Sequence, residues 1–222
     1  SIRRMGVTGI CGSGIIEVLA ELFLAGVILS DGTIDGAAAA RSPRVFQDGR
    51  TFSYRLHEST DPEEPRIVLT QADVRAIQLA KAALYAGIRL LMDHFGVERV
   101  DRIQLAGAFG SHIDVKYAMI LGMLPDCALD KVSSAGNAAG TGARIALLNQ
   151  QARDEIERVV RSVEKIETAV EVRFQEHFVE AMAIPHRSAP YPELSRAVVL
   201  PKPRFAEGPS EGEGRRRRRR AG

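Results

Sequence analysis

The sequence contains few cysteines, few aromatic residues and no tryptophan. Two cysteines, Cys11 and Cys127, occur among 222 residues, and aromatic residues make up 5% of the chain. Two cysteines are too few for a disulfide framework or for a four-thiolate metal site, so we expect a reducing compartment such as the cytoplasm. Hydrophobic residues still make up 45% of the chain, so the core must consist mainly of Leu, Ile, Val and Ala.

The sequence also lacks a long apolar run and a basic face. Its apolar stretches are shorter than the roughly 20 residues of a membrane span, and no signal peptide opens the chain. The net charge of +2 comes from six arginines at 215–220, because residues 1–200 carry 22 Lys and Arg against 25 Asp and Glu, a net charge of −3. We therefore expect neither a membrane nor a nucleic-acid partner. The start at Ser1 predicts that the chain is the C-terminal piece of a longer protein.

Three glycine-rich loops are present instead: GICGSG at 9–14, AGAFG at 106–110 and GNAAGTG at 136–142. Each leads into an expected helix at once or within a few residues. Backbone N–H groups at a helix N-terminus are unpaired and carry the positive end of the dipole, so such loops suit phosphates. None is a Walker loop, and the glycine spacing at 9–14 reverses the dinucleotide fingerprint. A tight strand-to-helix turn is the better explanation of any one loop, but three together favour a ligand.

The first half of the chain predicts one helix, a hairpin region and a long second helix. Helical periodicity covers residues 15–29, with Gly26 as the stop. The composition of residues 31–66 predicts a hairpin or loop, with strand-like stretches at VFQ and TFSYRL. Thr70 and Asp73 resemble a capping box at the start of a helix that runs to about Phe95, and Gly96 closes it.

The second half predicts two consecutive strand, glycine-loop and helix units. Strands are expected over 100–106 and 131–135, with helices over 115–124, capped by Asp114, and over 143–149. A helix over 152–165 and a strand-like VEVRF at 170–174 follow. The composition changes at about Pro190, so we divide the chain into a nucleotide-binding domain, 1–190, and a disordered Arg-rich tail, 191–222.

The order of these elements resembles the nucleotide-binding second half of the actin, sugar kinase and heat-shock chaperone superfamily. Five segments resemble one family within it, the reductive activators of corrinoid proteins: GICGSGIIEVLAEL, TQADVRAIQLAKAALYAGI, VDRIQLAGAFGSHID, GNAAGTGARIAL and FQEHFVEAMAIPH. The resemblance covers about residues 5–187. It implies an α/β fold, half of an actin-like (ribonuclease H-like) ATPase with a mixed sheet flanked by helices.

The resemblance also implies a nucleotide site. One loop would face the adenosine, a second would form a neighbouring wall, one helix would lie beside the base or ribose, and the first loop would approach from the other side. The loop that faces the adenosine would contain Gly107, Ala108, Phe109 and Gly110, and the neighbouring wall would contain Gly136, Asn137 and Gly140. The helix would contribute Gln78 and Lys81. The first loop would contribute Gly12 and Ser13, whose hydroxyl is available.

Members of this family resemble two-part machines that return Co(II) corrinoid to Co(I) with the help of ATP. The resemblance implies ATP and Mg²⁺ as cofactors, a [2Fe–2S] cluster only in a domain absent from this chain, and a corrinoid protein or methyltransferase as partner. The first phosphate loop and the acidic residue for magnesium are missing, so this chain alone is expected to hydrolyse ATP poorly. A homodimer is compatible with the sequence.

Two alternatives stay open at this stage: a small-molecule kinase of the same superfamily, and a binding module that nucleotide merely switches. No catalytic residue and no metal ligand is assigned, since the five histidines show no metal-ligand spacing and are expected to be structural or exposed. Cys11, which stands before a helix, is expected to have a lowered pKa.

Overall fold

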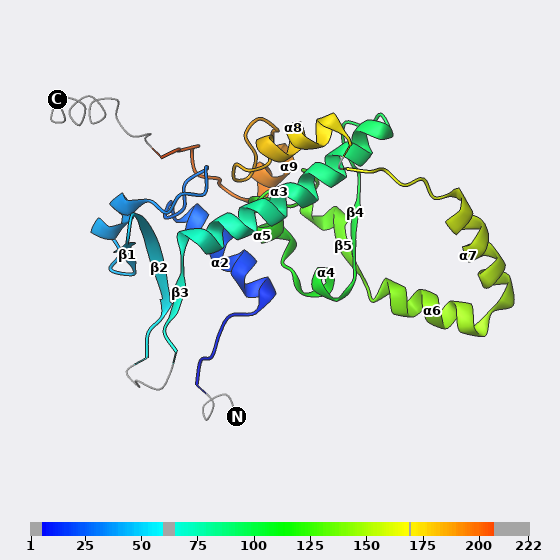
Figure 1. The fold of residues 1–222 in the computed structure, drawn as a ribbon, viewed down its shortest axis with the longest axis horizontal. Coiled ribbons are helices and arrows are strands. Elements are labelled where there is room, and N and C mark those ends of the chain that lie inside the picture. The colour runs from blue at the N-terminus through cyan, green and yellow to red at the C-terminus, as the bar shows by residue number, and fades with distance from the viewer. Residues whose placement is uncertain (1–5, 60–64, 169, 207–222) are drawn as a thin grey trace, which may run out of the picture.

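The longest helix, α3 (Gln71–His94), runs across the middle of the molecule (Figure 1). The structure is a computed structural model and describes residues 6–59, 65–168 and 170–206, without the side chains of Ala108 and Phe109. The Thr70 hydroxyl accepts a hydrogen bond from Asp73 N at 3.2 Å, and the Asp73 carboxylate accepts one from Thr70 N at 2.8 Å. The predicted capping box is therefore confirmed. Gly96 follows the helix with φ +64°, a conformation that glycine adopts without strain.

Helices α2 (Gly12–Leu24) and α5 (Val115–Ile120) pack together beneath α3 and contribute much of the core. Both end before their predicted bounds. Gly26 has φ +65° and turns the chain after α2, whereas Gly122, with φ +73°, turns it after α5 and before Pro125. Asp114 caps α5 as predicted and accepts from Lys116 N at 2.8 Å.

The expected hairpin region is an antiparallel sheet. The short helix η1 (Gly36–Ala40) precedes strands β1 (Val45–Asp48), β2 (Thr51–His57) and β3 (Ile67–Leu69), which lie in the order β1-β2-β3. The two strand-like stretches of the sequence are confirmed as β1 and β2.

A second sheet contains β4 (Ile103–Ala106) and β5 (Val132–Gly136), which pair in parallel with Ile103 opposite Val132. The short helix α4 (Ala108–His112) follows β4, and the single turn η2 (Leu129–Lys131) precedes β5. Both predicted strands exist, and parallel pairing places their carboxyl ends, with the glycine loops, at one edge of the sheet.

The stretch VEVRF, expected to be a strand, instead leads into helix α8 (Val172–Glu180), which packs along α3. Phe174 and Phe178 lie one helical turn apart, with ring centroids 6.3 Å apart. Five alternating residues cannot distinguish a strand from the start of an amphipathic helix, and packing against α3 decides for the helix.

Residues 191–206 were assigned from the sequence to a disordered tail, but here they pack on the body. Helix α9 (Pro192–Ala197) buries Leu194 completely, and the Tyr191 hydroxyl donates to Leu124 O at 3.0 Å. Asp126 accepts from Glu193 N and Leu194 N and so supplies the cap that the local sequence lacks. The six arginines lie outside the described residues.

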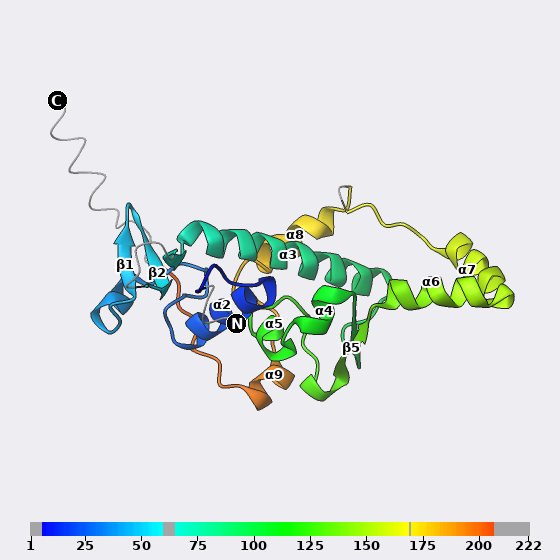
Figure 2. The ribbon, with the colours of Figure 1, turned by 90° about the horizontal axis from the view of Figure 1, so that it is seen from below.

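Helices α6 (Ala138–Leu148) and α7 (Gln150–Ser162) form a hairpin that projects from the body in both views (Figures 1 and 2). Neither contains a buried residue. Helix α6 begins earlier than predicted, inside the expected loop 136–142. In the described part of the chain, no helix is long and apolar enough to cross a membrane.

Candidate functional site

The structure brings two of the three glycine loops into direct contact. Gly107 follows β4 and Gly136 ends β5, and Gly107 N donates to Gly136 O at 2.8 Å. Both glycines adopt left-handed backbone conformations, with φ +101° and +62°. Because parallel strands present their carboxyl ends at the same edge, the two loops form one continuous backbone surface, which we call the paired loops. In open α/β sheets ligands bind at this edge.

Two serines connect the paired loops. Ser111 Oγ donates to Gly107 O at 3.1 Å and lies 3.2 Å from Ser134 Oγ, which in turn accepts from Gly136 N at 3.1 Å. These bonds fix the carbonyl and amide directions of both loops. The sequence analysis did not single out Ser111 or Ser134. The only available signal was their position, since Ser111 directly follows the 106–110 loop and Ser134 lies two residues before the 136–142 loop.

Glycine is suited to four positions in these loops for two different structural reasons. A Cβ at Gly110 would come within 2.9 Å of Leu105 Cβ, and one at Gly140 within 2.6 Å of the Asn137 amide nitrogen. These two glycines therefore allow close packing. A Cβ at Gly107 or Gly136 would meet no atom within 4 Å, so the space in front of them is open. An open, side-chain-free backbone fits the close approach of a nucleotide.

Asn137 caps helix α6 and accepts from Gly140 N at 2.9 Å through its side-chain oxygen. The helix therefore starts directly at the paired loops, with its unpaired N–H groups at the same edge of the sheet. Asn137 and Gly140 shape this helix start. Ala108 and Phe109 open α4, and their side chains lie outside the description of the structure.

Gly12 and Ser13 form the first turn of α2, which lies beside α4 in both views (Figures 1 and 2). Cys11 is exposed and caps this helix, accepting from Gly14 N at 3.3 Å, while its Sγ lies 3.4 Å from Ser13 Oγ. The hydrogen bond with Ser13, followed by that with the Gly14 amide, lowers the pKa of the Cys11 thiol. All three glycine loops therefore occur on neighbouring elements.

Gln78 and Lys81 are not part of this surface, and here the structure corrects the sequence analysis. Both side chains are 1% exposed. Lys81 Nζ donates to the carbonyls of Ala183 and Pro185, and burial lowers the pKa of Lys81 to about 7. Gln78 Nε2 donates to Asp31 O and Met182 O. Their polar heads bind main-chain carbonyls, so neither is exposed to a base or ribose.

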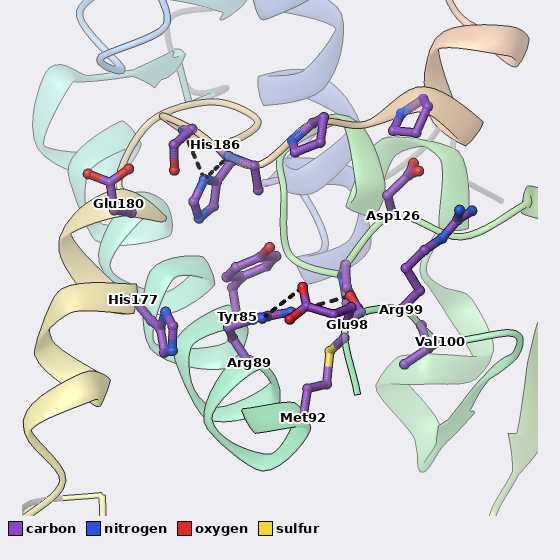
Figure 3. Close-up of a pocket in the computed structure, with 15 residues that line it drawn as sticks. Tyr85, Arg89, Met92, Glu98, Arg99, Val100, Asp126, His177, Glu180 and His186 are labelled. Atoms are coloured by element: carbon purple, nitrogen blue, oxygen red, sulfur yellow. Dashed lines mark hydrogen bonds and ion pairs between the residues drawn. The ribbon is translucent and has the colours of Figure 1, made fainter. Parts of the chain in front are cut away.

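A separate cavity of about 540 Å³ lies between α3, α8 and the 186–192 segment (Figure 3). His186 Nδ1 accepts from Ser188 N and Ala189 N, and its ring lies 4.8 Å from that of Tyr85. Burial, followed by the charge of Lys81, lowers the pKa of His186 to about 4, so the ring is neutral. The imidazole is therefore fixed by the fold.

The charges around this cavity largely compensate one another. His177 Nε2 lies 2.6 Å from Asp93 Oδ2, and Arg89 and Arg173 both lie 3.2 Å from the same carboxylate. Burial raises the pKa of Asp93, but the His177 and arginine contacts outweigh it and hold the pKa below its usual value. This cluster ties α8 to α3 and is structural. In the described ranges, no three His, Cys, Asp or Glu residues form a metal-binding group.

Three comparisons bear on the identity of the chain. The sequence model of a protein family described as the C-terminal domain of RACo, the ASKHA domain, matches residues 1–195. The chain is 38% identical over 186 residues to the corrinoid activation enzyme RamQ of Eubacterium limosum, and covers 31% of that protein. A solved structure of a reductive activator for corrinoid, iron-sulfur protein matches with a TM-score of 0.70 and 35% identity, over 80% of this chain and 28% of the other.

These matches confirm the predicted fold class, an actin-like (ASKHA) α/β fold. The described strands lie in two separate sheets, one antiparallel and one parallel, and not in the single mixed sheet that the sequence predicted. The chain spans about a third of the curated relative it matches.

Proposed function

We propose that this chain is the ATP-binding part of an ATP-dependent reductive activator. The proposal follows from its family, because the chain belongs to the C-terminal ASKHA domains of RACo. In the longer protein, ATP would support the one-electron reduction of a Co(II) corrinoid to Co(I). The electron would come from an iron–sulfur domain outside this chain. The partner would be the corrinoid protein of a methyltransferase system, in a reducing compartment such as the cytoplasm, which suits two free thiols.

One observation carries the nucleotide assignment: the hydrogen bond from Gly107 N to Gly136 O, which joins two open glycine backbones at the carboxyl edge of β4 and β5. Glycines without a packing reason leave room for a ligand, and the start of α6 adds unpaired N–H groups there. We assign Gly107, Gly110, Gly136, Asn137 and Gly140 to this wall of the site. Gly12 and Ser13 would approach from α2.

The residues present suit binding better than hydrolysis. Asp114, the carboxylate that follows α4 along the chain, caps α5 through Oδ1, which accepts from Lys116 N and Tyr117 N. Among the described residues no three His, Cys, Asp or Glu side chains form a metal-binding group, so a magnesium ion would be held chiefly through the phosphates of the nucleotide and through groups of the longer protein. This chain would position the adenosine side, and the second half of the cleft would supply the metal ligands and the attacking water.

The test is calorimetric binding of a non-hydrolysable ATP analogue with magnesium to this chain and to Gly107→Ala and Gly136→Ala. A methyl group at either position would occupy the open space against which the nucleotide lies. We expect binding to weaken by about tenfold or more, the scale of a lost close contact or hydrogen bond.

Gly49→Ala is the matched control. Gly49 has φ +62° and no atom within 4 Å of a Cβ, as at Gly136, but it lies in the β1–β2 turn. Gly136→Ala and Gly49→Ala place alanine at the same φ, so thermal unfolding should place these two variants at similar stability, whereas Gly107→Ala, at φ +101°, carries more backbone strain. Binding that is unchanged in all three variants, or absent in the unmodified chain, would contradict the proposal that this chain holds the nucleotide.

A further inference from the structure

A cavity of about 720 Å³ lies at the β1–β2 end of the molecule, away from the paired loops. Four segments line it: the 29–37 stretch with the start of η1, the β1–β2 turn, the first turns of α3, and residues 204–206. We call it the arginine cavity. Its volume falls in the range of small-molecule sites, which is about 300–1,000 Å³.

The charge around the arginine cavity is one-sided. Arg50, Arg75 and Arg204 line it, and Asp35 is the one acidic residue among the described residues of its lining. Arg204 Nη2 lies 2.5 Å from Asp35 Oδ2, so these two charges neutralise each other. Arg50 and Arg75 make no ion pair or side-chain hydrogen bond among the described residues. Two arginines from different segments therefore line one cavity without an ion-pair partner among the described residues.

The walls of the cavity are held in place by hydrogen bonds between distant segments. Ser30 N donates to Arg204 O at 2.7 Å, and Ala206 N donates to Asp31 Oδ2 at 2.8 Å. Gln71 accepts from Ile34 N and donates to Gly32 O, both at 2.8 Å. These bonds fix the C-terminal wall and the start of α3 against the same loop, so the cavity exists before a ligand binds.

The floor of the cavity is apolar. Leu29 and Ile34 are buried there, and the rings of Phe52 and Phe205 border it. Gly36 allows this arrangement, because a Cβ at this position would lie 2.3 Å from the Phe52 ring. The site thus combines two arginines, neither paired with any residue that the structure describes, with an aromatic surface.

We propose that the arginine cavity binds a small organic anion, a carboxylate or a phosphate ester that carries an apolar group. Guanidinium groups recognise both oxyanions through paired N–H donors, and the apolar part of the ligand lies against Phe52 and Phe205. The site is independent of the nucleotide wall, since the two share no residue.

The experiment is titration of the ¹⁵N-labelled chain, followed by NMR, with benzoate and with phenyl phosphate. Phenol serves as the uncharged probe and inorganic phosphate as the probe without an apolar group. We expect saturable shifts at Arg50, Phe52 and Arg75 with benzoate or phenyl phosphate, and binding at least about tenfold weaker with phenol and with inorganic phosphate. The anion that binds more tightly identifies the oxyanion class.

Arg50→Gln and Arg75→Gln should each weaken binding by about tenfold, the effect of losing one charged hydrogen bond. Neither substitution should unfold the chain, because both side chains are exposed. Arg158→Gln, an exposed arginine on α7, is the matched control and should bind as the unmodified chain does. Equal affinity in all three variants, equal binding of phenol, or no saturable shift with either anion would overturn the proposal.

Discussion

At the scale of single residues, helix α3 differs from a simple amphipathic helix because its buried face carries two polar side chains. Lys81 and Gln78 lie one helical turn apart and together bind four carbonyls, in the 31 loop and in residues 182–185. Gln78 Oε1 has no partner among the described atoms. When these carbonyls are buried they lose their hydrogen bonds with water, and the two side chains donate replacements. These bonds hold the segment after α8 against α3.

Burial of Lys81 should make stability depend on pH. The pKa of Lys81 is lowered by burial from 10.5 to about 7, although its two carbonyl acceptors favour the ammonium form. Between these values the unfolded chain binds a proton that the folded chain does not, so the free energy of unfolding rises with pH. Relative to that of Lys81→Met, the free energy of unfolding of the unmodified chain should rise by at most about 1.4 kcal/mol per pH unit above pH 7.

Urea unfolding at pH 7, 8 and 9 measures this gain. Other titrating groups contribute equally to both proteins and cancel in the difference. Lys131→Met, a substitution of an exposed lysine in η2, should show no such trend. A difference between the unmodified chain and Lys81→Met that stays constant over this range would show that Lys81 remains charged in the fold.

At the scale of elements, the helix starts are specified by individual side chains. Thr70 caps α3, Asp114 caps α5 and Asn137 caps α6, each through an oxygen that accepts from a main-chain N–H in the first turn. Helix α9 has no side-chain cap of its own and takes both N-terminal hydrogen bonds from Asp126. Long-range caps of this kind cannot be recognised from local spacing.

Removing the Thr70 cap should destabilise the chain. Thr70→Ala leaves the N–H of Asp73 without its acceptor, and such losses amount to about 1 kcal/mol. Urea denaturation at neutral pH measures the change. Thr141→Ala deletes the same atoms inside α6, where alanine favours the helix, and should leave stability unchanged or slightly higher. Equal losses in both variants would contradict a specific capping role.

At the scale of the whole molecule, the chain consists of a packed body and a projecting hairpin. Helices α2, α3, α5, α8 and α9 surround the core, whereas α6 and α7 contact mainly each other. Apolar side chains stay exposed on the hairpin, among them Leu147, Leu148, Val160 and Val163. Few tertiary contacts support these two helices, so their stability depends chiefly on local interactions.

Hydrogen exchange should separate the hairpin from the body. Helices α2 and α7 both contain 13 residues, but α2 buries five of them and α7 buries none. After correction for intrinsic rates, the central amides of α7 should exchange at least roughly tenfold faster, because α7 can open without unfolding the core. Mass spectrometry or NMR measures both helices in one sample. Equal protection would contradict the independence of the hairpin.

The sequence by itself determined the elements whose cause is local. The Thr70–Asp73 capping box, Gly96, the β1–β2 hairpin and the two strand and glycine-loop units depend on neighbouring residues, whose spacing is visible in the chain. The family resemblance also implied that the loops after β4 and β5 are neighbours, and the parallel pairing of the two strands places these loops together.

Only the tertiary structure decided the features that depend on residues far apart in sequence. Lys81 and Gln78 are buried because segments about a hundred residues away supply carbonyl partners. The VEVRF stretch becomes part of α8 because α3 offers a surface for packing, and α9 forms because Asp126 caps it. Local propensity differs little between the alternatives in these stretches, so long-range contacts determine the outcome.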